Sequence, residues 1–492
     1  MKKTALILGC GASGLAAAEY LTRRGWSLVV ADTRNAPGGL ARLRQIAPEA
    51  RFTGGAMPPE LLDGVELVVM SPGLSPEHSD AAPLVARARA RGTPVVGEIE
   101  LFARELARLR AETGYEPRVI GITGTNGKTT TTTLVGLMMA GSGVSTHVAG
   151  NIGPNAITEL LKCEDEKKLP ECWVLELSSF QLETTSSLVC DCAAFLNLTQ
   201  DHIDWHGSLE RYAQAKMRIF SEKTIRVLNR EDRFTMQAAG ESLTETFGEG
   251  EPRSPGEWGL SERDGLMWLA RIARTSGAES KNRFLREPDP GMELLMPEQA
   301  LKIRGRHNAM NALAALALTV AAGGSLAAGL KVLTDYRGEA HRVQSVLTVN
   351  GIEFIDDSKG TNVGATVAAL AGLGRAGVRS SIILGGDAKG QDFGPIAEAL
   401  KLYASHVVLI GRDAPRIASV LAAQGIPYEE CGTDFEKAVD RAFLAAEAGQ
   451  AVLLSPACAS WDMFTSYAER SERFVECARQ LAGQQEGGKQ EL

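Results

Sequence analysis

The feature that most constrains the fold is a short β-branched run that leads through a glycine-rich turn into a helix. Residues 119–130 read Val-Ile-Gly-Ile-Thr-Gly-Thr-Asn-Gly-Lys-Thr-Thr, which predicts a buried strand before the turn and a helix from Lys128. Backbone N–H groups in such a turn, with the dipole of the helix, bind anionic oxygens. Lys128 would then reach terminal phosphates and the Thr129 hydroxyl would ligate Mg²⁺. The pattern departs from the usual phosphate loop, because Ile122 stands at the first glycine position, and a glycine-rich turn with an ordinary surface lysine is the alternative.

A second glycine pattern lies near the start of the chain. Gly9-Cys-Gly-Ala-Ser-Gly14 follows an apolar strand and opens a helix, and the next strand ends at Asp32. This spacing is typical of a dinucleotide-binding βαβ unit. A third strand runs into Ser71-Pro-Gly73, a turn at the carboxyl edge of the sheet, where ligands of such folds bind. An NAD-dependent dehydrogenase is therefore one open interpretation.

The length of 492 residues exceeds what one hydrophobic core supports and predicts about three domains. We place them at 1–97 (Rossmann-like), 98–338 (a central ATPase-type domain with a mainly parallel sheet) and 339–492 (Rossmann-like), all of the α/β class. A net charge of −8 argues against a general nucleic-acid or membrane-surface binder. The eight cysteines include no C-x-x-C pair and no apolar run approaches ~20 residues, so we expect a cytoplasmic protein with reduced thiols and no membrane insertion.

Polar residues follow two predicted strands of the central domain. Glu176 ends a strand at 173–177, where a carboxylate facing a phosphate loop is a usual partner for Mg²⁺; capping of a turn is its alternative role. His202 lies among aspartates after a strand at 193–198 and could ligate a second metal ion, although isolated histidines are more often structural. Lys216 lies on a predicted helix, and by sequence alone it is expected to be a surface lysine.

Three loops of the third domain each place polar side chains directly after a strand. They are Asp356-Asp-Ser-Lys-Gly-Thr-Asn362, Gly385-Gly-Asp-Ala-Lys389 and Ser455-Pro-Ala-Cys-Ala-Ser460. A hairpin with a type I′ turn at Asn350-Gly351 precedes them. Since parallel strands end at one sheet edge, the loops predict a single polar site there.

Together these segments resemble the Mur ligase family, the ATP-dependent amide-bond formers of peptidoglycan precursor synthesis, from the first strand to about residue 478. Gly-Thr-Asn-Gly-Lys-Thr at 124–129 is shared across that family and accounts for the departure from the usual phosphate loop. The segments at 176–183, 357–362 and 455–460 are narrower and are similar to the D-glutamate-adding branch. The resemblance implies that ATP phosphorylates the carboxylate of UDP-N-acetylmuramoyl-L-alanine and that the amine of D-glutamate attacks the acyl phosphate.

The resemblance also implies roles for residues. Lys128, Glu176, His202 and Lys216 would be catalytic, and two Mg²⁺ ions would be held by Thr129, Glu176, His202 and Lys216, the last as an N6-carboxylated lysine. Carboxylation turns a cation into an anion and needs a neutral amine, hence a site that lowers a pKa of ~10.4. ATP would be bound by Gly124, Thr125, Asn126, Gly127, Lys128, Thr129, Thr130, Asn308, Asn311, Arg342, Asp357 and Lys359.

The substrates would be held by residues of all three domains. Ala12, Ser13, Asp32, Thr33, Arg34, Ser71, Pro72 and Gly73 would bind the UDP moiety, Asn151 and Gln181 the sugar-peptide, and Thr361, Lys389, Ser460, Trp461 and Tyr467 D-glutamate. Lys389 would pair with a carboxylate. Trp461 and Tyr467 differ from the Leu and Phe often found there, and the 240–300 insertion, where we expect short strands, is longer than usual. A monomer is expected.

Other interpretations remain. A dehydrogenase leaves the 124–129 loop unexplained, whereas a folylpolyglutamate-synthase-like ligase would not need the first ninety-odd residues. A non-catalytic nucleotide-binding scaffold would lack converging ligands at 176, 202 and 216. A sister Mur ligase that adds another amino acid would share the mechanism.

Overall fold

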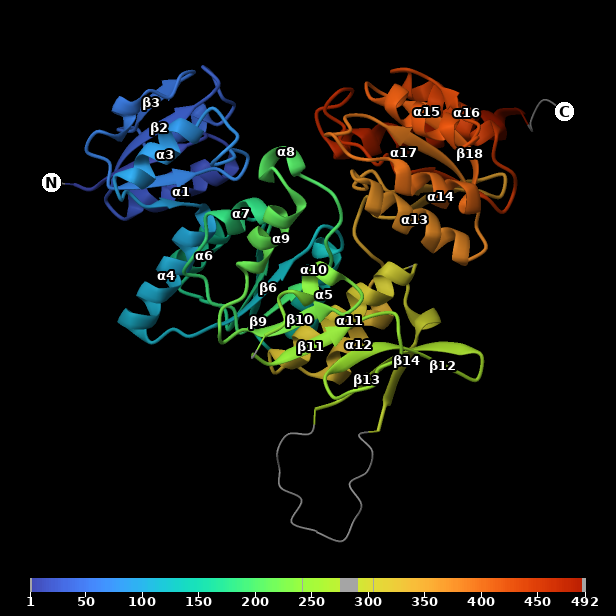
Figure 1. Ribbon diagram of the computed structural model, residues 1–492, viewed down its shortest axis with the longest axis horizontal. Helices are drawn as coiled ribbons and strands as arrows, with labels where there is room; N and C mark the ends of the chain where they lie inside the picture. Colours follow the sequence, from blue (N-terminus) through green and yellow to red (C-terminus); the bar gives the residue numbers. More distant parts are fainter. Residues whose placement is uncertain (1, 241, 275–290, 304, 489–492) are drawn as a thin grey trace, which may run out of the picture.

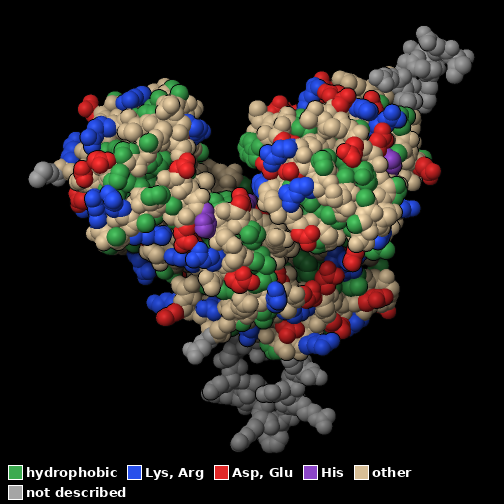
Figure 2. All heavy atoms as spheres, turned by 45° about the horizontal axis from the view of Figure 1, so that its top comes forward, with side chains coloured by type: hydrophobic (Ala, Val, Ile, Leu, Met, Phe, Trp, Pro, Cys, Tyr) green, Lys and Arg blue, Asp and Glu red, His purple; other side chains and the backbone are tan. Residues whose placement is uncertain are grey.

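The protein folds into three sheets, each in its own part of the chain (Figure 1). The structure is a computed structural model that describes residues 2–240, 242–274, 291–303 and 305–488. The first and third domains both lie on the central domain, and a space-filling view shows a cleft between them (Figure 2). The predicted three-domain α/β architecture is confirmed, while the exact boundaries at 97 and 338 stay predictions.

The first sheet has the strand order β3-β2-β1-β4-β5 within the described residues, and all its pairs are parallel. Its strands are β1 (Thr4–Leu8), β2 (Ser27–Asp32), β3 (Arg51–Gly54), β4 (Leu67–Met70) and β5 (Val95–Val96). Its helices are α1 (Ala12–Arg23), α2 (Leu40–Ile46), α3 (Ala82–Ala90) and the short η1 (Pro59–Leu62). The sequence missed the edge strands β3 and β5, because they are short and lack the continuous apolar run of a strand buried on both faces.

The central sheet has the order β14-β13-β12-β11-β10-β9-β6-β8-β7 in the described part of the chain. Its strands are β6 (Arg118–Thr123), β7 (Thr146–Gly150), β8 (Cys172–Glu176), β9 (Cys192–Phe195), β10 (Ile225–Asn229), β11 (Thr244–Phe247), β12 (Glu257–Arg263), β13 (Leu266–Ile272) and β14 (Glu293–Pro297). Strands β6 to β12 pair in parallel, and β13 and β14 add antiparallel pairs at one edge. The short strands expected in the 240–300 insertion are therefore present, although residues 275–290 lie outside the described part.

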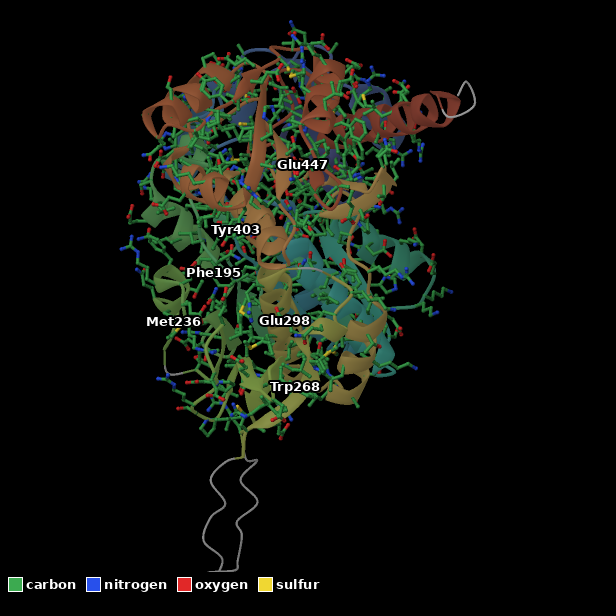
Figure 3. The ribbon with its side chains drawn as sticks, turned by 90° about the vertical axis from the view of Figure 1, so that its right-hand side faces the viewer. Phe195, Met236, Trp268, Glu298, Tyr403 and Glu447 are labelled. Carbon is green, nitrogen blue, oxygen red and sulfur yellow. The ribbon has the colours of Figure 1, made fainter. Side chains whose placement is uncertain are left out.

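Helices cover both faces of the central sheet. They are α4 (Glu98–Thr113), α5 (Lys128–Gly141), α6 (Ala156–Asp165), α7 (Ser179–Glu183), α8 (Ile203–His206), α9 (Leu209–Met217), α10 (Arg233–Met236), α11 (Arg306–Ala321), α12 (Leu326–Asp335) and the short η2 (Glu298–Ala300). Ile120 and Val174 pack with α5 and α11 on one face, whereas Trp173 and Leu175 pack with α4 and α6 on the other. The second of these cores continues into the first domain, which fixes the two domains to each other. In Figure 3, Trp268 of β13 lies at the end of the molecule opposite Glu447 of the third domain.

The third sheet has the order β15-β16-β20-β17-β18-β19 among the described residues. Its strands are β15 (Gln344–Val349), β16 (Ile352–Asp356), β17 (Ser380–Gly385), β18 (Ala404–Ile410), β19 (Glu429–Glu430) and β20 (Ala451–Leu454), and its helices are α13 (Val363–Arg375), α14 (Gly394–Tyr403), α15 (Ala414–Ala423), α16 (Phe435–Leu444) and α17 (Tyr467–Gly488). The β15–β16 hairpin is antiparallel, and Asn350 (φ 51°) and Gly351 (φ 81°) have the positive φ values of the predicted type I′ turn. The other pairs are parallel.

Across the described residues of the whole chain, no helix has the length and apolarity needed to cross a membrane.

Candidate active site

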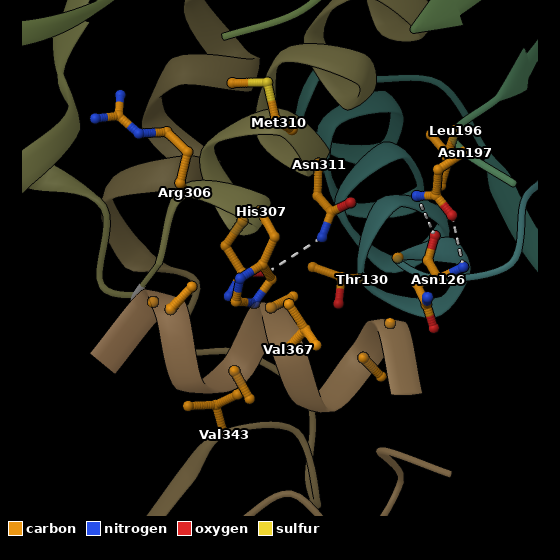
Figure 4. A pocket seen from close by; sticks show the side chains of 18 of the residues that line it. Asn126, Thr130, Leu196, Asn197, Arg306, His307, Met310, Asn311, Val343 and Val367 are labelled. Atoms are coloured by element: carbon orange, nitrogen blue, oxygen red, sulfur yellow. Dashed lines mark hydrogen bonds between the residues drawn. The ribbon is translucent and has the colours of Figure 1, made fainter. Parts of the chain in front are cut away.

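The glycine-rich turn lies between β6 and α5, as predicted, and is tied to the end of the neighbouring strand β9. The backbone N–H of Asn126 donates to Asn197 Oδ1 at 2.8 Å, and Asn197 Nδ2 donates to the Asn126 carbonyl at 3.0 Å (Figure 4). Gly127 has φ 83°, and a Cβ added there would lie 2.3 Å from Asn311 Oδ1. A glycine is therefore required for the turn to pass this close to α11. Asn197 was not singled out from the sequence, although its place at a strand's carboxyl end was a usable signal.

Lys128 curls over this turn. Its Nζ donates to the carbonyl oxygens of Gly124 and Thr125, both at 2.9 Å. Burial lowers the pKa of Lys128, and Arg342 lowers it further. The side-chain nitrogen of Lys128 is thus held inside the loop, where it would contact an anionic group bound by the turn's N–H groups.

Glu176 ends β8 beside the turn and is 1% exposed. Its Oε1 accepts a hydrogen bond from Asn151 Nδ2 at 3.0 Å, but its Oε2 is buried without a hydrogen-bond partner among the described residues. A buried carboxylate oxygen with no donor is costly unless a cation satisfies it. This oxygen is a hard donor of the kind that Mg²⁺ prefers, which fits the prediction that Glu176 ligates Mg²⁺.

His202 lies in a loop after β9 with the left-handed backbone angle φ 54°. Its ring packs edge-on against Phe180, with centroids 4.6 Å apart, and its Nε2 is 3.5 Å from Asp201 Oδ2. Burial, followed by the positive charges of Lys389, Lys128 and Lys216, lowers the pKa of His202 to about 3. The imidazole is therefore neutral at physiological pH, which is the form that ligates metals.

Lys216 is 1% exposed, so the expectation of a surface lysine is wrong. It lies on α9, whose inner face packs against the phosphate loop: Lys216 Nζ donates to the Gly124 carbonyl at 2.8 Å and lies 4.6 Å from the centroid of the Tyr212 ring. Burial, then the charge of Lys128, lowers the pKa of Lys216 well below its ordinary value. The signal in the sequence was the four-residue spacing of Tyr212 and Lys216, which puts both on one face of a helix.

A cavity of about 330 Å³ opens beside the loop, between α11 of the central domain and α13 of the third (Figure 4). Seven of the residues predicted to bind ATP line it: Asn126, Gly127, Thr130, Asn308, Asn311, Arg342 and Asp357. Arg342 Nη2 donates to Thr129 Oγ1 at 3.4 Å, so the third domain reaches the first turn of α5. Burial raises the pKa of Asp357 to about 7, against the opposing hydrogen bond from Ser455. Phe247, His307 and Arg375 also line the cavity and were not predicted.

The polar loops of the third domain face the same region. Lys389 lies close enough to His202 and Asp201 to lower both of their pKa values. Burial lowers the pKa of Lys359, and the nearby Glu176 carboxylate opposes this shift. Lys359 Nζ is 5.7 Å from the centroid of the Tyr467 ring. The loops after β16 and β17 thus bring cations toward the candidate metal ligands.

The remaining residues predicted for D-glutamate differ in their surroundings. Ser460 is buried and Thr361 is half-buried, with its carbonyl accepting a hydrogen bond from Gln391 Nε2 at 3.5 Å. Trp461 is 67% exposed. Its assignment to the pocket stays the least supported of these predictions.

A pair of asparagines joins the second and third domains. Asn362 Nδ2 donates to Asn126 Oδ1 at 3.0 Å, and Asn126 Nδ2 donates to Asn362 Oδ1 at 3.3 Å. Asn362 Oδ1 also caps α13 by accepting from the Ala365 N–H at 2.9 Å. We call this pair the asparagine bridge. No local pattern in the sequence indicates it, because its partners lie 236 positions apart.

A separate cavity of about 350 Å³ lies at the carboxyl edge of the first sheet. All eight residues predicted to bind the UDP moiety line it: Ala12, Ser13, Asp32, Thr33, Arg34, Ser71, Pro72 and Gly73. Asp32 accepts hydrogen bonds from the Cys10 N–H at 2.8 Å and from Arg34 Nε at 2.8 Å, and the hydrogen bond from Arg34 is the main cause that lowers the pKa of Asp32 to about 2. The Asp32 carboxylate thus orients the Arg34 guanidinium at the cavity.

The two residues predicted to contact the sugar-peptide, Asn151 and Gln181, are both hydrogen-bonded within the central domain. Asn151 contacts Glu176, as described above. Gln181 Oε1 accepts from both the N–H and the hydroxyl of Ser178, at 3.0 Å each, as part of a capping box at the start of α7. One polar atom of Gln181 is therefore used to hold the helix.

Comparisons with known proteins follow the same division into three parts. Three family models match the chain: "Mur ligase MurD-like, N-terminal domain" at residues 3–97, "Mur ligase middle domain" at 122–319 and "Mur ligase, glutamate ligase domain" at 341–458.

Full-length relatives are similar to the whole chain. A protein of Ralstonia nicotianae named UDP-N-acetylmuramoylalanine--D-glutamate ligase is 52% identical, and the match covers 97% of both chains. A protein of the same name from Burkholderia mallei is 49% identical, again over 97% of both. The chain belongs to the Mur ligase family. This membership confirms the predicted ATP-dependent, amide-bond-forming ligase over the dehydrogenase and scaffold interpretations.

Solved structures of other Mur ligases share the fold. UDP-N-acetylmuramate-alanine ligase of Thermotoga maritima covers 98% of this chain and 100% of its own, with 22% identity and a TM-score of 0.56. A MurF ligase of the same organism, solved in complex with ADP, covers 99% of this chain and 96% of its own, with 15% identity and a TM-score of 0.55. At these identities the likeness is one of architecture.

Proposed function

We propose that this ligase uses ATP to join D-glutamate to the carboxyl group of UDP-N-acetylmuramoyl-L-alanine, with ADP and phosphate as the other products. Relatives that carry this activity in their names match 97% of the chain at about half identity. The observation in the structure that supports the proposal is the convergence of the phosphate loop, Glu176, His202 and Lys216 with the cationic loops of the third domain.

The residues suggest how each reactant is held. The turn's N–H groups and Lys128 bind the ATP phosphates, the cavity between α11 and α13 takes the nucleoside, and the cavity around Arg34 takes the UDP moiety. A free carboxylate is a poor acyl donor. Transfer of the γ-phosphoryl group of ATP to this carboxylate releases ADP and gives an acyl phosphate, from which the amine of D-glutamate displaces phosphate as the amide bond forms. Lys389 lies where it can pair with a carboxylate of D-glutamate.

The anionic groups that meet here repel one another, so cations must neutralise them. Mg²⁺ bound by Thr129, Glu176, His202 and a carboxylated Lys216 would supply that neutralisation. The free Oε2 of Glu176 and the neutral imidazole of His202 fit such ions. The lowered pKa of Lys216 supplies the neutral amine that reacts with CO₂, and its proton leaves as the carbamate forms.

The test is release of phosphate from ATP with Mg²⁺ and UDP-N-acetylmuramoyl-L-alanine, with one candidate amino acid at a time. We expect release with D-glutamate and none with L-glutamate, meso-diaminopimelate or L-lysine. Release with one of the other amino acids alone would assign the protein to a sister activity of the family. A cytoplasmic location and a monomeric state stay predictions of the sequence.

A further inference from the structure

Outside the proposed active site, one cluster of side chains has the composition of a metal site. His147, Glu159 and Cys163 each offer one donor atom, and these three atoms lie within 4.8 Å of one another. Among the residues that the structure describes, it is the one group of three or more His, Cys, Asp or Glu side chains that meets this condition.

Two elements of regular structure hold the cluster. Glu159 and Cys163 are one helical turn apart on α6, so both point from one face of the helix. His147 lies on β7, the edge strand of the central sheet, against which α6 packs. Its ring is fixed by Trp173, with ring centroids 5.7 Å apart. The donors are therefore presented by a strand and a helix rather than by loops.

The distances are close to those of a tetrahedral site. His147 Nδ1 lies 2.9 Å from Glu159 Oε1 and 3.7 Å from Cys163 Sγ. Bonds of about 2.0–2.3 Å to a tetrahedral Zn²⁺ put neighbouring donor atoms about 3.3–3.6 Å apart. The donor atoms of Cys163 and Glu159 also lie within 4.8 Å of each other, so shifts on the order of 1 Å would seat an ion among all three.

The exposed fractions of the three side chains fit a cation that is bound by three protein ligands and one exchangeable ligand. Cys163 is fully buried, whereas the side chains of His147 and Glu159 are 28% and 12% exposed. A cation could reach the donors from the side of His147 and keep a water molecule as its fourth ligand. Burial and the charges of Glu159 and Glu166 raise the pKa of the Cys163 thiol, so the cation must displace the thiol proton.

We infer that His147, Glu159 and Cys163 form a binding site for a zinc-class divalent cation, separate from the Mg²⁺ ligands at the phosphate loop. The set of thiolate, imidazole and carboxylate selects borderline-soft ions, whereas Mg²⁺ prefers oxygen ligands alone. An ion bound at these three residues would join α6 to the edge strand β7. That strand leads within four residues to Asn151, which hydrogen-bonds to Glu176.

The test is a titration of the full-length protein, first stripped of metal, with Co²⁺. A thiolate ligand gives cobalt a charge-transfer absorption in the near ultraviolet that oxygen ligands do not give, so Co²⁺ at the Mg²⁺ site remains silent. We expect this band in the wild type, its loss on adding Zn²⁺, and its persistence in excess Mg²⁺.

Variants assign the band to its ligands. Cys163→Ser should abolish it, and His147→Gln and Glu159→Gln should each weaken Co²⁺ binding at least about tenfold. Cys477→Ser, at a buried thiol of the third domain, should leave it unchanged. Turnover with Mg²⁺ should persist in all of these variants, which shows that they fold. Absence of the band in the wild type, or its survival in Cys163→Ser or in both glutamine variants, would overturn the assignment.

Discussion

Two ionisable side chains of opposite type are buried at the centre of the central domain, and each lacks some of the hydrogen-bond or ion-pair partners that a buried charge needs. Lys216 is buried against a carbonyl and an aromatic ring, and Glu176 is buried with one oxygen free. Neither arrangement favours folding, because burial of an ionisable group costs free energy when its hydrogen-bonding atoms are not fully satisfied. Such arrangements are typical of sites that bind an added group.

Replacing Lys216 by alanine should lower the rate of phosphate release at least about 10²-fold, because one anionic metal ligand is lost. Acetate or another short carboxylic acid should partly restore the rate by occupying the place of the carbamate. Lys223→Ala, at an exposed lysine nearby, serves as the control and should retain full activity. Full activity of unrescued Lys216→Ala would refute the carbamate proposal.

Glu98 provides a test of charge burial away from the reaction. It is 4% exposed at the start of α4, its Oε1 accepts from the Ile157 N–H at 2.6 Å, and burial raises its pKa to about 7. The native state therefore keeps a proton that the unfolded chain releases near pH 4.5. Stability should fall as pH rises from about 4.5 to about 7, by on the order of 3 kcal/mol from this residue, and then level off.

Glu98→Gln keeps the oxygen that accepts from Ile157 and removes this titration. Urea midpoints measured at pH 5 and pH 8 should differ less in the variant than in the wild type. Equal pH dependence of the two proteins would show that Glu98 is ionised in the folded state.

At the scale of elements, the phosphate loop illustrates why some parts of the fold follow from the sequence. The strand, the turn and the start of α5 at Lys128 were predicted, because β-branched residues, glycines and helix formers each act locally. The hairpin turn at Asn350-Gly351 was predicted for the same reason. The burial of Lys216 was not, since it depends on how α9 packs against a loop ninety positions away.

The geometry of the loop predicts a difference between two glycine variants. Gly127 and Gly143 share nearly the same φ, 83° and 84°, but a Cβ at Gly127 would meet Asn311 while Gly143 has open space. Both alanine variants should lose about 1–2 kcal/mol of stability from backbone strain. Gly127→Ala alone should also weaken ATP binding, measured by calorimetry, because the turn and α11 must separate. Equal ATP affinity in the two variants would contradict this account.

At the scale of the whole molecule, the third domain lies against the phosphate loop through side chains of both domains. The asparagine bridge and the contact of Arg342 with Thr129 join elements more than 200 positions apart. Family resemblance predicted which residues meet at the site, but no local pattern could predict the contacts between domains. They depend on how two separately folded units dock.

Breaking the asparagine bridge should loosen this docking. Asn362→Ser keeps a residue that can cap α13 but is too short to reach Asn126. Loss of two hydrogen bonds of about 1 kcal/mol each should raise the KM for ATP about 5–30-fold. Small-angle scattering should show a larger radius of gyration without nucleotide. Gln424→Ala, at an exposed position of the same domain, is the control, and an unchanged KM and radius in Asn362→Ser would rule out a role for the bridge.

One carbonyl oxygen, that of Gly124, accepts hydrogen bonds from both Lys128 and Lys216. On the carbamate proposal, Lys216 loses an N–H proton as it takes up CO₂ and gains a negative charge next to Lys128. Two lysines that now share one acceptor would then become a pair of opposite charge. On the carbamate proposal, turnover of the purified protein should therefore depend on dissolved CO₂ as well as on ATP and amino acid.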